Sequence, residues 1–227
     1  MESNVEVGNT KIGDMGVSRL CFGTYQMIQR VKEPIDAINL MQQAYESGIN
    51  FFDTADQYGP SEALIRFAIS QGILPKDKVV IATKVGYPTT GDEYADFKSR
   101  NKLNENGMPV DASPARIRQQ VDKSLSNLGI DAIGIYQIHD FDPSTSHLEV
   151  ISAMNDLIND GKIRHYGFSN YTQSEVLDSI NACRENGFKH YPISLQNLHN
   201  IANPQDPLLI EVALNNEVGM KVESLLE

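Results

Sequence analysis

The sequence predicts an α/β fold: a (β/α)8 TIM barrel with an N-terminal hairpin, of which about seven strands are visible in this chain. Three observations support this prediction. Short β-branched runs alternate with longer amphipathic stretches, which is typical of a parallel sheet covered by helices. The repeats recur with a period of roughly 30 residues, the length of a βα unit. No strand opens a Gly-rich phosphate loop of the GxGxxG or GxxxxGK type, which counts against a Rossmann or P-loop sheet. We therefore expect residues 1–227 to form a single barrel domain whose C-terminal end is incomplete.

The first part of the chain is expected to supply the hairpin and three strands. Val5–Ser18 contains two Gly-containing turn pairs and is interpreted as the hairpin. The predicted strands are Leu20–Gly23, Ile49–Asp53 and Val79–Lys84, and the predicted helices between them are Pro34–Ser47 and Ser61–Ser70. A long polar loop, Gly86–Ser113, follows the third strand. Connections of this length usually bind something or are disordered.

The clearest helix is Pro114–Leu128, since Ser113 is a good N-cap, Pro114 suits the first helical position and Gly129 ends it. Its apolar side chains fall on one stripe, as expected for a helix that covers a sheet. The remaining predicted elements alternate: strand Ala132–Ile138, helix Leu148–Asp160, strand His165–Phe168, helix Gln173–Asn186, strand Pro192–Gln196, helix Leu208–Asn216 and a last strand Met220–Leu225.

Composition and charge exclude several classes of protein. With 41% hydrophobic and 22% charged residues, the chain is neither collagen-like nor intrinsically disordered. The formal net charge of −11 repels phosphate backbones, so we expect no nucleic-acid partner and no anionic membrane surface. Cys21 and Cys183 are too few for a disulfide framework and are expected to be free thiols. The N-terminus has no apolar signal core and no segment is long enough to span a bilayer, which predicts a cytoplasmic protein.

A glycine and a series of polar residues stand where the predicted strands stop. In chain order they are Gly23, Thr24 and Tyr25, then Asp53 and Tyr58, then Lys84, then His139 and Asp140, then Ser169 and Asn170, and finally Gln196. Each has an ordinary interpretation alone: Asp53 as a turn cap, Lys84 as an exposed lysine, His139 as a rim histidine. Because the carboxyl ends of barrel strands meet at one mouth, we expect all of them to face one another there.

These residue types suit the reduction of a carbonyl group. A hydride arriving at the carbonyl carbon leaves negative charge on the oxygen, which then needs a proton. A phenol with a pKa of about 10 is a weak acid, but a neighbouring ammonium favours the phenolate, and a carboxylate holds that ammonium in place. Tyr58, Lys84 and Asp53 are groups of these three kinds, and His139 can donate a hydrogen bond to the same oxygen. Ser169, Asn170 and Gln196 offer the hydroxyl and amide groups that a nicotinamide carboxamide requires.

Four segments resemble, in the right order, the signatures of the aldo-keto reductase family: Phe51–Gly59, Ala82–Lys84, Tyr136–His139 and Gly161–Asn170. The resemblance implies a (β/α)8 barrel that reduces small-molecule aldehydes and ketones with NADPH and without a Rossmann motif. It implies Tyr58 as the acid, Lys84 and Asp53 as the groups that tune it, and His139 as the carbonyl-orienting group. It also implies cofactor contacts by Asp53, Ser169, Asn170 and Gln196 at the nicotinamide end and by Gly23, Thr24 and Tyr25 near the ribose.

The resemblance is incomplete toward the C-terminus. Val222–Leu225 offers no aromatic side chain to stack on the nicotinamide, and the basic segment that grips the adenosine 2′-phosphate has no counterpart. The carbonyl substrate, the choice between NADPH and NADH and the oligomeric state therefore stay open. Two alternatives also stay open. One is a non-catalytic barrel that binds a nucleotide or a protein partner, and the other is a metal-dependent hydrolase that uses His139, Asp140 and Asp53.

Overall fold

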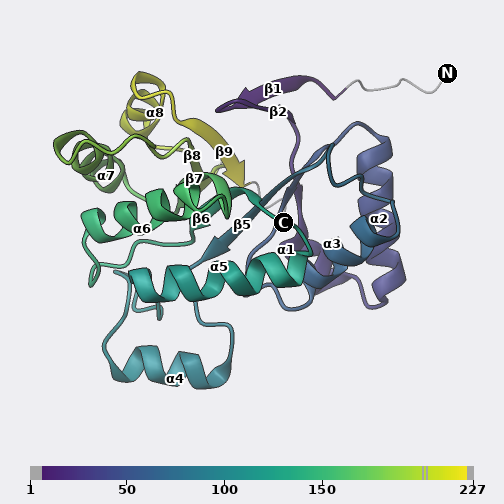
Figure 1. Cartoon of the computed structure of the whole chain (residues 1–227), viewed down its shortest axis with the longest axis horizontal. Coiled ribbons are helices and arrows are strands. Elements are labelled where there is room, and N and C mark those ends of the chain that lie inside the picture. The colour runs from purple at the N-terminus through teal and green to yellow at the C-terminus, as the bar shows by residue number, and fades with distance from the viewer. Residues whose placement is uncertain (1–6, 201, 203, 224–227) are drawn as a thin grey trace.

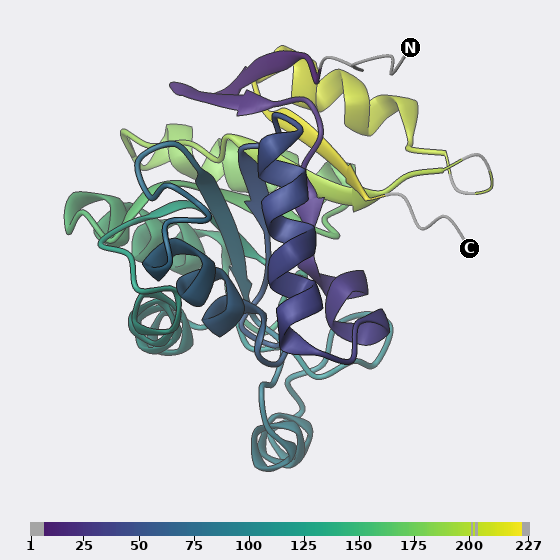
Figure 2. The ribbon, with the colours of Figure 1, turned by 90° about the vertical axis from the view of Figure 1, so that its right-hand side faces the viewer.

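The computed structural model describes residues 7–200, 202 and 204–223. Its centre is a seven-stranded parallel sheet whose strands follow one another in chain order, curled into a half-barrel (Figure 1, Figure 2). The strands are β3 (Phe22–Gly23), β4 (Phe51–Asp53), β5 (Val80–Val85), β6 (Ile133–Ile138), β7 (Ile163–Ser169), β8 (Ser194–Leu198) and β9 (Gly219–Glu223). The predicted strand order and fold class are confirmed. The predicted last strand continued to Leu225, and its final two residues lie outside the described part of the chain.

Helices cover the outer face of the sheet (Figure 1). Within the described residues they are α1 (Thr24–Arg30), α2 (Pro34–Glu46), α3 (Ser61–Ser70), α4 (Gly91–Ser99), α5 (Pro114–Leu128), α6 (His147–Asn159), α7 (Gln173–Glu185) and α8 (Pro207–Asn215). The predicted bounds of α3 and α5 are confirmed, and Ser113 caps α5 by accepting a hydrogen bond from the Arg116 backbone N–H. Large side chains on the outer face of the strands, such as Phe52, Tyr136 and Phe168, are buried against these helices.

The predicted hairpin forms from β1 (Asn9–Ile12) and β2 (Met15–Ser18), and the first two residues of its predicted range lie outside the described part of the chain. It closes the end of the half-barrel where the strands begin, through an apolar cluster of Ile12, Met15, Val17, Phe51, Ala82 and Ile135. Side chains two residues apart in a strand lie on the same face. The residues two positions beyond the last three members of the cluster are Asp53, Lys84 and Gln137. Along each of these strands, the side chain that faces the barrel interior is therefore apolar near the start of the strand and polar at the next inward-facing position, toward the carboxyl end.

Two helices were not predicted, and each has a physical reason. The segment expected to be a long loop, Gly86–Ser113, contains α4, in which only Phe97 is buried, so it shows no apolar stripe. Its stability comes instead from the Thr90 cap and from the Arg116–Glu93 ion pair. The other helix, α1, starts directly after the two-residue strand β3 and has no side-chain cap. Tyr25 thus lies in a helix rather than in a strand-end loop.

Candidate active site

A buried ion pair joins the ends of two neighbouring strands at the centre of the site. Asp53 is the last residue of β4, and Lys84 lies near the end of β5. The Nζ of Lys84 donates hydrogen bonds to Asp53 Oδ2 (2.7 Å) and to the carbonyl oxygen of Thr54 (3.1 Å). Only 1% of the Lys84 side chain is exposed, so the two charges interact with little screening by solvent.

A second ammonium group, that of Lys221 on β9, binds the same carboxylate. Its Nζ contacts Asp53 Oδ1 and also donates to Gln137 Oε1 at 3.3 Å. Burial alone would raise the pKa of Asp53, but the ammonium groups of Lys221 and Lys84 hold it well below its usual range. The aspartate is therefore ionised between two lysines.

Lys221 and Gln137 were not predicted to lie at the strand-end cluster. The parallel register places Lys221 opposite Gln196, which was predicted to lie in the site. A strand partner of this kind is the one signal that could have identified the lysine. Gln137 lies opposite Lys84 in the register and is fully buried. Gln137 stands two residues before His139. A polar side chain inside the otherwise apolar strand β6 was a signal that could have identified Gln137 as a site residue.

Tyr58 and His139 come together from different strand ends. The Tyr58 hydroxyl lies 3.4 Å from His139 Nε2, and the two rings meet edge to face. The Nζ of Lys84 lies 5.1 Å from the centroid of the Tyr58 ring. Burial, together with the positive charge of Lys84, holds the pKa of His139 well below its usual range, so its imidazole is neutral. A phenol and a neutral imidazole arranged in this way can both reach one carbonyl oxygen.

Ser169, Asn170 and Gln196 lie together at neighbouring strand ends, and Gln196 contacts the Asp53 carboxylate. Ser169 pairs with Gln196 across β7 and β8, and the backbone N–H of Asn170 donates to the Gln196 carbonyl oxygen at 3.0 Å. The Gln196 Nε2 donates to Asp53 Oδ2 at 3.3 Å. Its other amide atom, Oε1, is buried and has no hydrogen-bond partner among the described residues. An acceptor left in this state is suited to a ligand that brings an amide N–H.

Asn170 is placed by an unusual backbone conformation. Its φ of 58° lies in the left-handed region, which asparagine tolerates better than most residues. In this conformation its Nδ2 donates to the backbone carbonyl oxygen of His139 at 2.9 Å. The residue therefore holds the β6 strand end next to the β7 strand end.

Gly23, Thr24 and Tyr25 border the same site from the edge strand. Gly23 pairs with Asp53 in the β3–β4 register, and the Thr24 hydroxyl donates to the Asp53 carbonyl oxygen at 3.0 Å. The ring of Tyr25 lies 5.0 Å from that of Tyr58, centroid to centroid, and 40% of Tyr25 is exposed. At this edge of the half-barrel, Thr24 thus contacts Asp53 and Tyr25 contacts Tyr58.

Asp56, between Asp53 and Tyr58, has an unexpected environment. Both of its carboxylate oxygens are buried and have no hydrogen-bond partner within the described residues. Burial raises its pKa to about 8, although the nearby Arg116 acts in the opposite direction. We therefore expect this carboxyl group to be mainly protonated at neutral pH.

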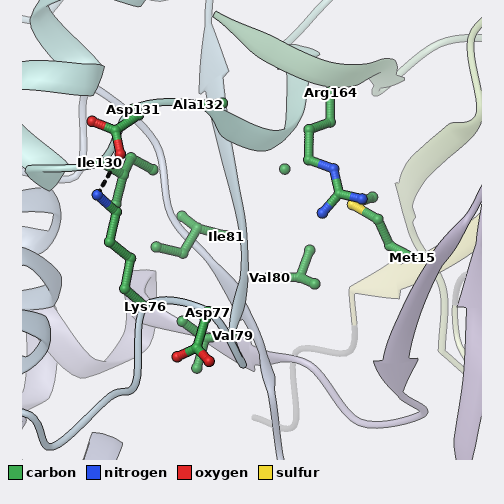
Figure 3. A pocket seen from close by; sticks show the side chains of 11 residues that line it. Met15, Lys76, Asp77, Val79, Val80, Ile81, Ile130, Asp131, Ala132 and Arg164 are labelled. Atoms are coloured by element: carbon green, nitrogen blue, oxygen red, sulfur yellow. Dashed lines mark hydrogen bonds and ion pairs between the residues drawn. The ribbon is translucent and has the colours of Figure 1, made fainter. Parts of the chain in front are cut away.

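The opposite end of the half-barrel holds a separate pocket of about 280 Å³ (Figure 3). Lys76, paired with Asp131 at 2.6 Å, stands on one side of it, and Arg164 and Met15 stand on the other. None of the predicted site residues lines this pocket. The polar strand ends and this pocket are therefore independent features of the molecule.

The surroundings of the acidic side chains bear on the metal-dependent alternative. In residues 7–200, 202 and 204–223, no three His, Cys, Asp or Glu side chains are grouped so that they could hold a metal ion. The residues that a metal-dependent hydrolase would use are engaged otherwise, since Asp53 binds two lysines and Asp140 accepts from Tyr87 and Asn104. No helix of the described residues combines the length and the apolar character needed to cross a membrane.

Comparisons with known proteins identify the family of the chain. Residues 19–227 match the aldo/keto reductase family. The chain is 31% identical to versiconal hemiacetal acetate reductase of Aspergillus parasiticus, over 96% of this chain and 64% of that protein. It is 30% identical to an uncharacterized oxidoreductase of Schizosaccharomyces pombe, over 91% of this chain and 62% of that protein. It is 29% identical to 6-dehydroglucose reductase of Novosphingobium aromaticivorans, over 71% of this chain and 50% of that protein. The chain thus spans less than two thirds of the length of these curated relatives.

Proposed function

The chain belongs to the aldo/keto reductase family, and we propose that it reduces an aldehyde or ketone to the alcohol with NADPH as the hydride donor and Tyr58 as the general acid. The observation that carries this proposal is the meeting of Tyr58, His139, Lys84 and Asp53 at one end of the half-barrel. Relatives named as reductases support carbonyl reduction as the reaction class.

Each of these side chains has a distinct task in the proposal. Tyr58 donates the proton of its hydroxyl to the carbonyl oxygen as negative charge develops there. Lys84 supplies a positive charge near the Tyr58 ring, and this charge favours the phenolate that proton transfer leaves behind. His139, neutral because of its burial, donates a hydrogen bond to the same oxygen and orients the carbonyl group. Asp53 holds Lys84 in position.

The residues on the other side of Asp53 fit a nicotinamide. When bound, the reduced nicotinamide supplies the hydride. Ser169, Asn170 and Gln196 would hold its carboxamide, and the buried Gln196 Oε1 is available to accept the amide N–H. Gly23, Thr24 and Tyr25 would border the ribose. The preference for NADPH over NADH rests on the family resemblance.

We further propose that residues 1–227 act as one domain with a small-molecule carbonyl substrate. The proposed site draws on every strand of the sheet, from Gly23 on β3 to Lys221 on β9, which supports a single domain.

Cofactor titration and a turnover assay together test the proposed function. Quenching or enhancement of NADPH fluorescence measures binding, and the loss of NADPH absorbance measures turnover with small aldehydes and ketones. We expect saturable NADPH binding, weaker NADH binding and measurable turnover. Saturable binding with no turnover across aldehydes and ketones would favour the non-catalytic, nucleotide-binding alternative. The absence of binding would contradict the proposal.

A further inference from the structure

The ring of Tyr87, a residue outside the predicted site, packs against the imidazole of His139. The ring centroids are 4.7 Å apart and the planes are inclined by 58°. Tyr87 is the second residue of the long connection between β5 and α5, residues 86–113, which we call the β5–α5 insertion. The imidazole of His139 thus has aromatic neighbours on two sides, Tyr87 from the insertion and Tyr58 from the β4–α3 turn.

The Tyr87 side chain is itself held in place by the residue that follows His139. Its hydroxyl donates to Asp140 Oδ2 at 2.5 Å. Burial, then the hydrogen bond to Asp140, raises the pKa of Tyr87 above its usual range, so the hydroxyl stays a donor and does not compete with Tyr58 as the acid. A hydrogen bond to a carboxylate is stronger than one between neutral groups, so it fixes the ring of Tyr87 firmly.

Asp140 is fixed in turn from the insertion and from its own backbone. Its Oδ2 also accepts from Asn104 Nδ2 at 2.7 Å, and its Oδ1 accepts from the Phe141 backbone N–H at 2.8 Å. Asn104 is 7% exposed, and its Oδ1 accepts from the backbone N–H groups of Asn106 and Met108. The insertion therefore reaches Asp140 through a side chain that is fixed at both of its ends.

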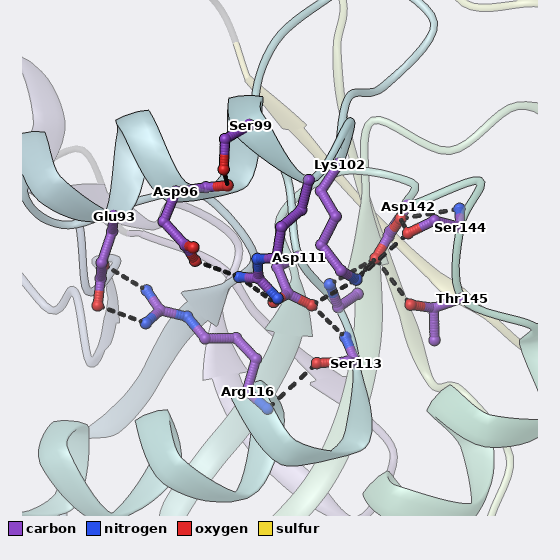
Figure 4. A network of polar contacts seen from close by, with 12 residues as sticks. Glu93, Asp96, Ser99, Lys102, Asp111, Ser113, Arg116, Asp142, Ser144 and Thr145 are labelled. Atoms are coloured by element: carbon purple, nitrogen blue, oxygen red, sulfur yellow. Dashed lines mark hydrogen bonds and ion pairs between the residues drawn. The ribbon is translucent and has the colours of Figure 1, made fainter.

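A second set of contacts anchors the insertion to the β6–α6 loop, residues 139–146, which also contains Asp140 (Figure 4). Lys102 Nζ binds Asp111 at 2.8 Å and Asp142 at 3.3 Å, so Lys102 and Asn104 bind Asp142 and Asp140, respectively. At the other end of α4, Arg116 binds both oxygens of Glu93, at 2.7 and 3.0 Å. The β5–α5 insertion is thus fixed at several points. Tyr87 lies near its start, where the chain leaves β5 at the mouth of the half-barrel.

The imidazole of His139 has few other constraints. Its Nδ1 is buried and has no hydrogen-bond partner among the residues that the structure describes, and its Nε2 faces the Tyr58 hydroxyl at 3.4 Å. Asn170 holds only the His139 backbone. The orientation of the ring therefore depends on side-chain packing. We infer that Tyr87 is a positioning residue for His139, and that Asp140 and Asn104 hold Tyr87 in place; this inference rests on the proposed carbonyl reduction.

Tyr87→Phe and Tyr87→Leu separate the hydrogen bond from the ring contact. Tyr87→Phe keeps the ring but releases it from Asp140, so kcat should fall about tenfold, and Tyr87→Leu should lower it about a hundredfold, because small misplacements of catalytic groups have effects of this size. NADPH affinity should stay unchanged in both variants. Tyr94→Phe is the matched control, because Tyr94 lies on α4 in the same insertion and is 44% exposed; it should leave kcat unchanged.

Proton NMR of the histidine ring reports on the geometry without turnover. The His139 resonances are assigned by their loss in His139→Gln. Tyr87→Leu should shift them because the ring current of Tyr87 is lost, whereas Tyr87→Phe should cause a smaller change and Tyr94→Phe none. Unmoved His139 resonances in Tyr87→Leu would overturn the inference. So would unchanged kcat in both Tyr87 variants while His139→Gln lowers it. If the wild-type protein reduces no carbonyl compound, the proposed function fails, and the shift of the His139 resonances in Tyr87→Phe, which keeps the aromatic ring, still tests whether the Tyr87–Asp140 hydrogen bond orients the two rings.

Discussion

Lys84 and Lys221, from an inner strand and an edge strand of the sheet, bind opposite oxygens of the Asp53 carboxylate. Lys84 also lies over the Tyr58 ring, whereas Lys221 also binds Gln137. The two lysines therefore serve different neighbours. Lys84 connects the carboxylate to the proposed acid, and Lys221 ties the edge strand β9 to the interior of the half-barrel.

Lys84→Met should destabilise the protein strongly. A partner removed from a buried ion pair costs about 3–5 kcal/mol because the remaining charge stays buried, and Lys221 will offset part of this cost. Lys76→Met is the matched control, since Lys76 forms an ion pair of nearly the same length, 2.6 Å, with 48% of its side chain exposed. Lys76→Met should cost far less than Lys84→Met, because solvent screens the exposed Lys76–Asp131 pair. Urea denaturation measures both values, and similar losses in the two variants would contradict the assignment of a buried pair.

Lys221→Met should make the protein less stable at neutral pH by about 1–3 kcal/mol, the value of a hydrogen bond to a charged group. The folded-state pKa of Asp53 is depressed below 3.8. The stabilisation by the Asp53–Lys221 contact is therefore fully present above pH 3.8, the usual pKa of an aspartate, and is lost as the pH falls through the folded-state pKa of Asp53. The difference between wild type and Lys221→Met should be largest at about pH 7 and should narrow below about pH 4. A difference that stays constant with pH would argue against the Asp53–Lys221 contact, and Lys123→Met, an exposed lysine on α5, should show no difference.

Asp56→Asn should stabilise the protein relative to wild type, and this gain should grow as the pH rises. The pKa of Asp56 is about 8 in the folded protein against a usual value of 3.8. Between these values the folded protein keeps a proton that the unfolded chain has lost, so the free energy of unfolding falls as the pH rises. Asp56→Asn removes this dependence and should gain stability relative to wild type as the pH is raised from about 4 to about 8. Denaturation series across this range measure the gain. Parallel curves for the two proteins would show that Asp56 is ionised, and Asp77→Asn, an exposed aspartate, supplies the control.

Gln196→Leu should weaken cofactor binding while leaving the acid in place. It removes the acceptor Oε1 and the bond from Nε2 to Asp53. The Kd for NADPH should rise about tenfold, the effect of one lost hydrogen bond in a buried site. Fluorescence titration measures it, with Gln119→Leu on the exposed face of α5 as the control. An unchanged Kd would remove Gln196 from the proposed carboxamide site.

The alternation of strands and helices, and the polar residues at strand ends, could be predicted because both follow from local patterns. Side chains repeat about every 3.6 residues on one face of a helix and every 2 residues on one face of a strand, which separates the two in the sequence. Parallel strands bring their carboxyl ends to one edge of the sheet. Asp53, Lys84 and Gln196 were found in this way. The rest depends on contacts distant in sequence. The helix α4 has one buried side chain and is held by Arg116 on α5, so its own residues carry no apolar periodicity.

The contacts of Tyr87 with His139 and of Lys221 with Asp53 could not be predicted, for a related reason. Tyr87 reaches His139 because the β5–α5 insertion is tied to the β6–α6 loop through Asn104 and Asp140, and no local pattern reveals this pairing. Lys221 faces Asp53 because β9 pairs in register with β8. A lysine in a short predicted strand is more often exposed, and its burial follows from the curvature of the whole sheet.

The most direct test of the proposed reaction follows the hydride itself. The protein is incubated with an aldehyde and with NADPH that carries deuterium at the transferable position of nicotinamide C4, and mass spectrometry locates the deuterium. Wild type should place one deuterium on the former carbonyl carbon of the alcohol. Tyr58→Phe should bind NADPH with similar affinity but should lower the rate of transfer by at least about a hundredfold, the contribution typical of a positioned general acid. Deuterium-labelled alcohol formed by Tyr58→Phe at the wild-type rate, or unlabelled alcohol from the wild type, would contradict the account.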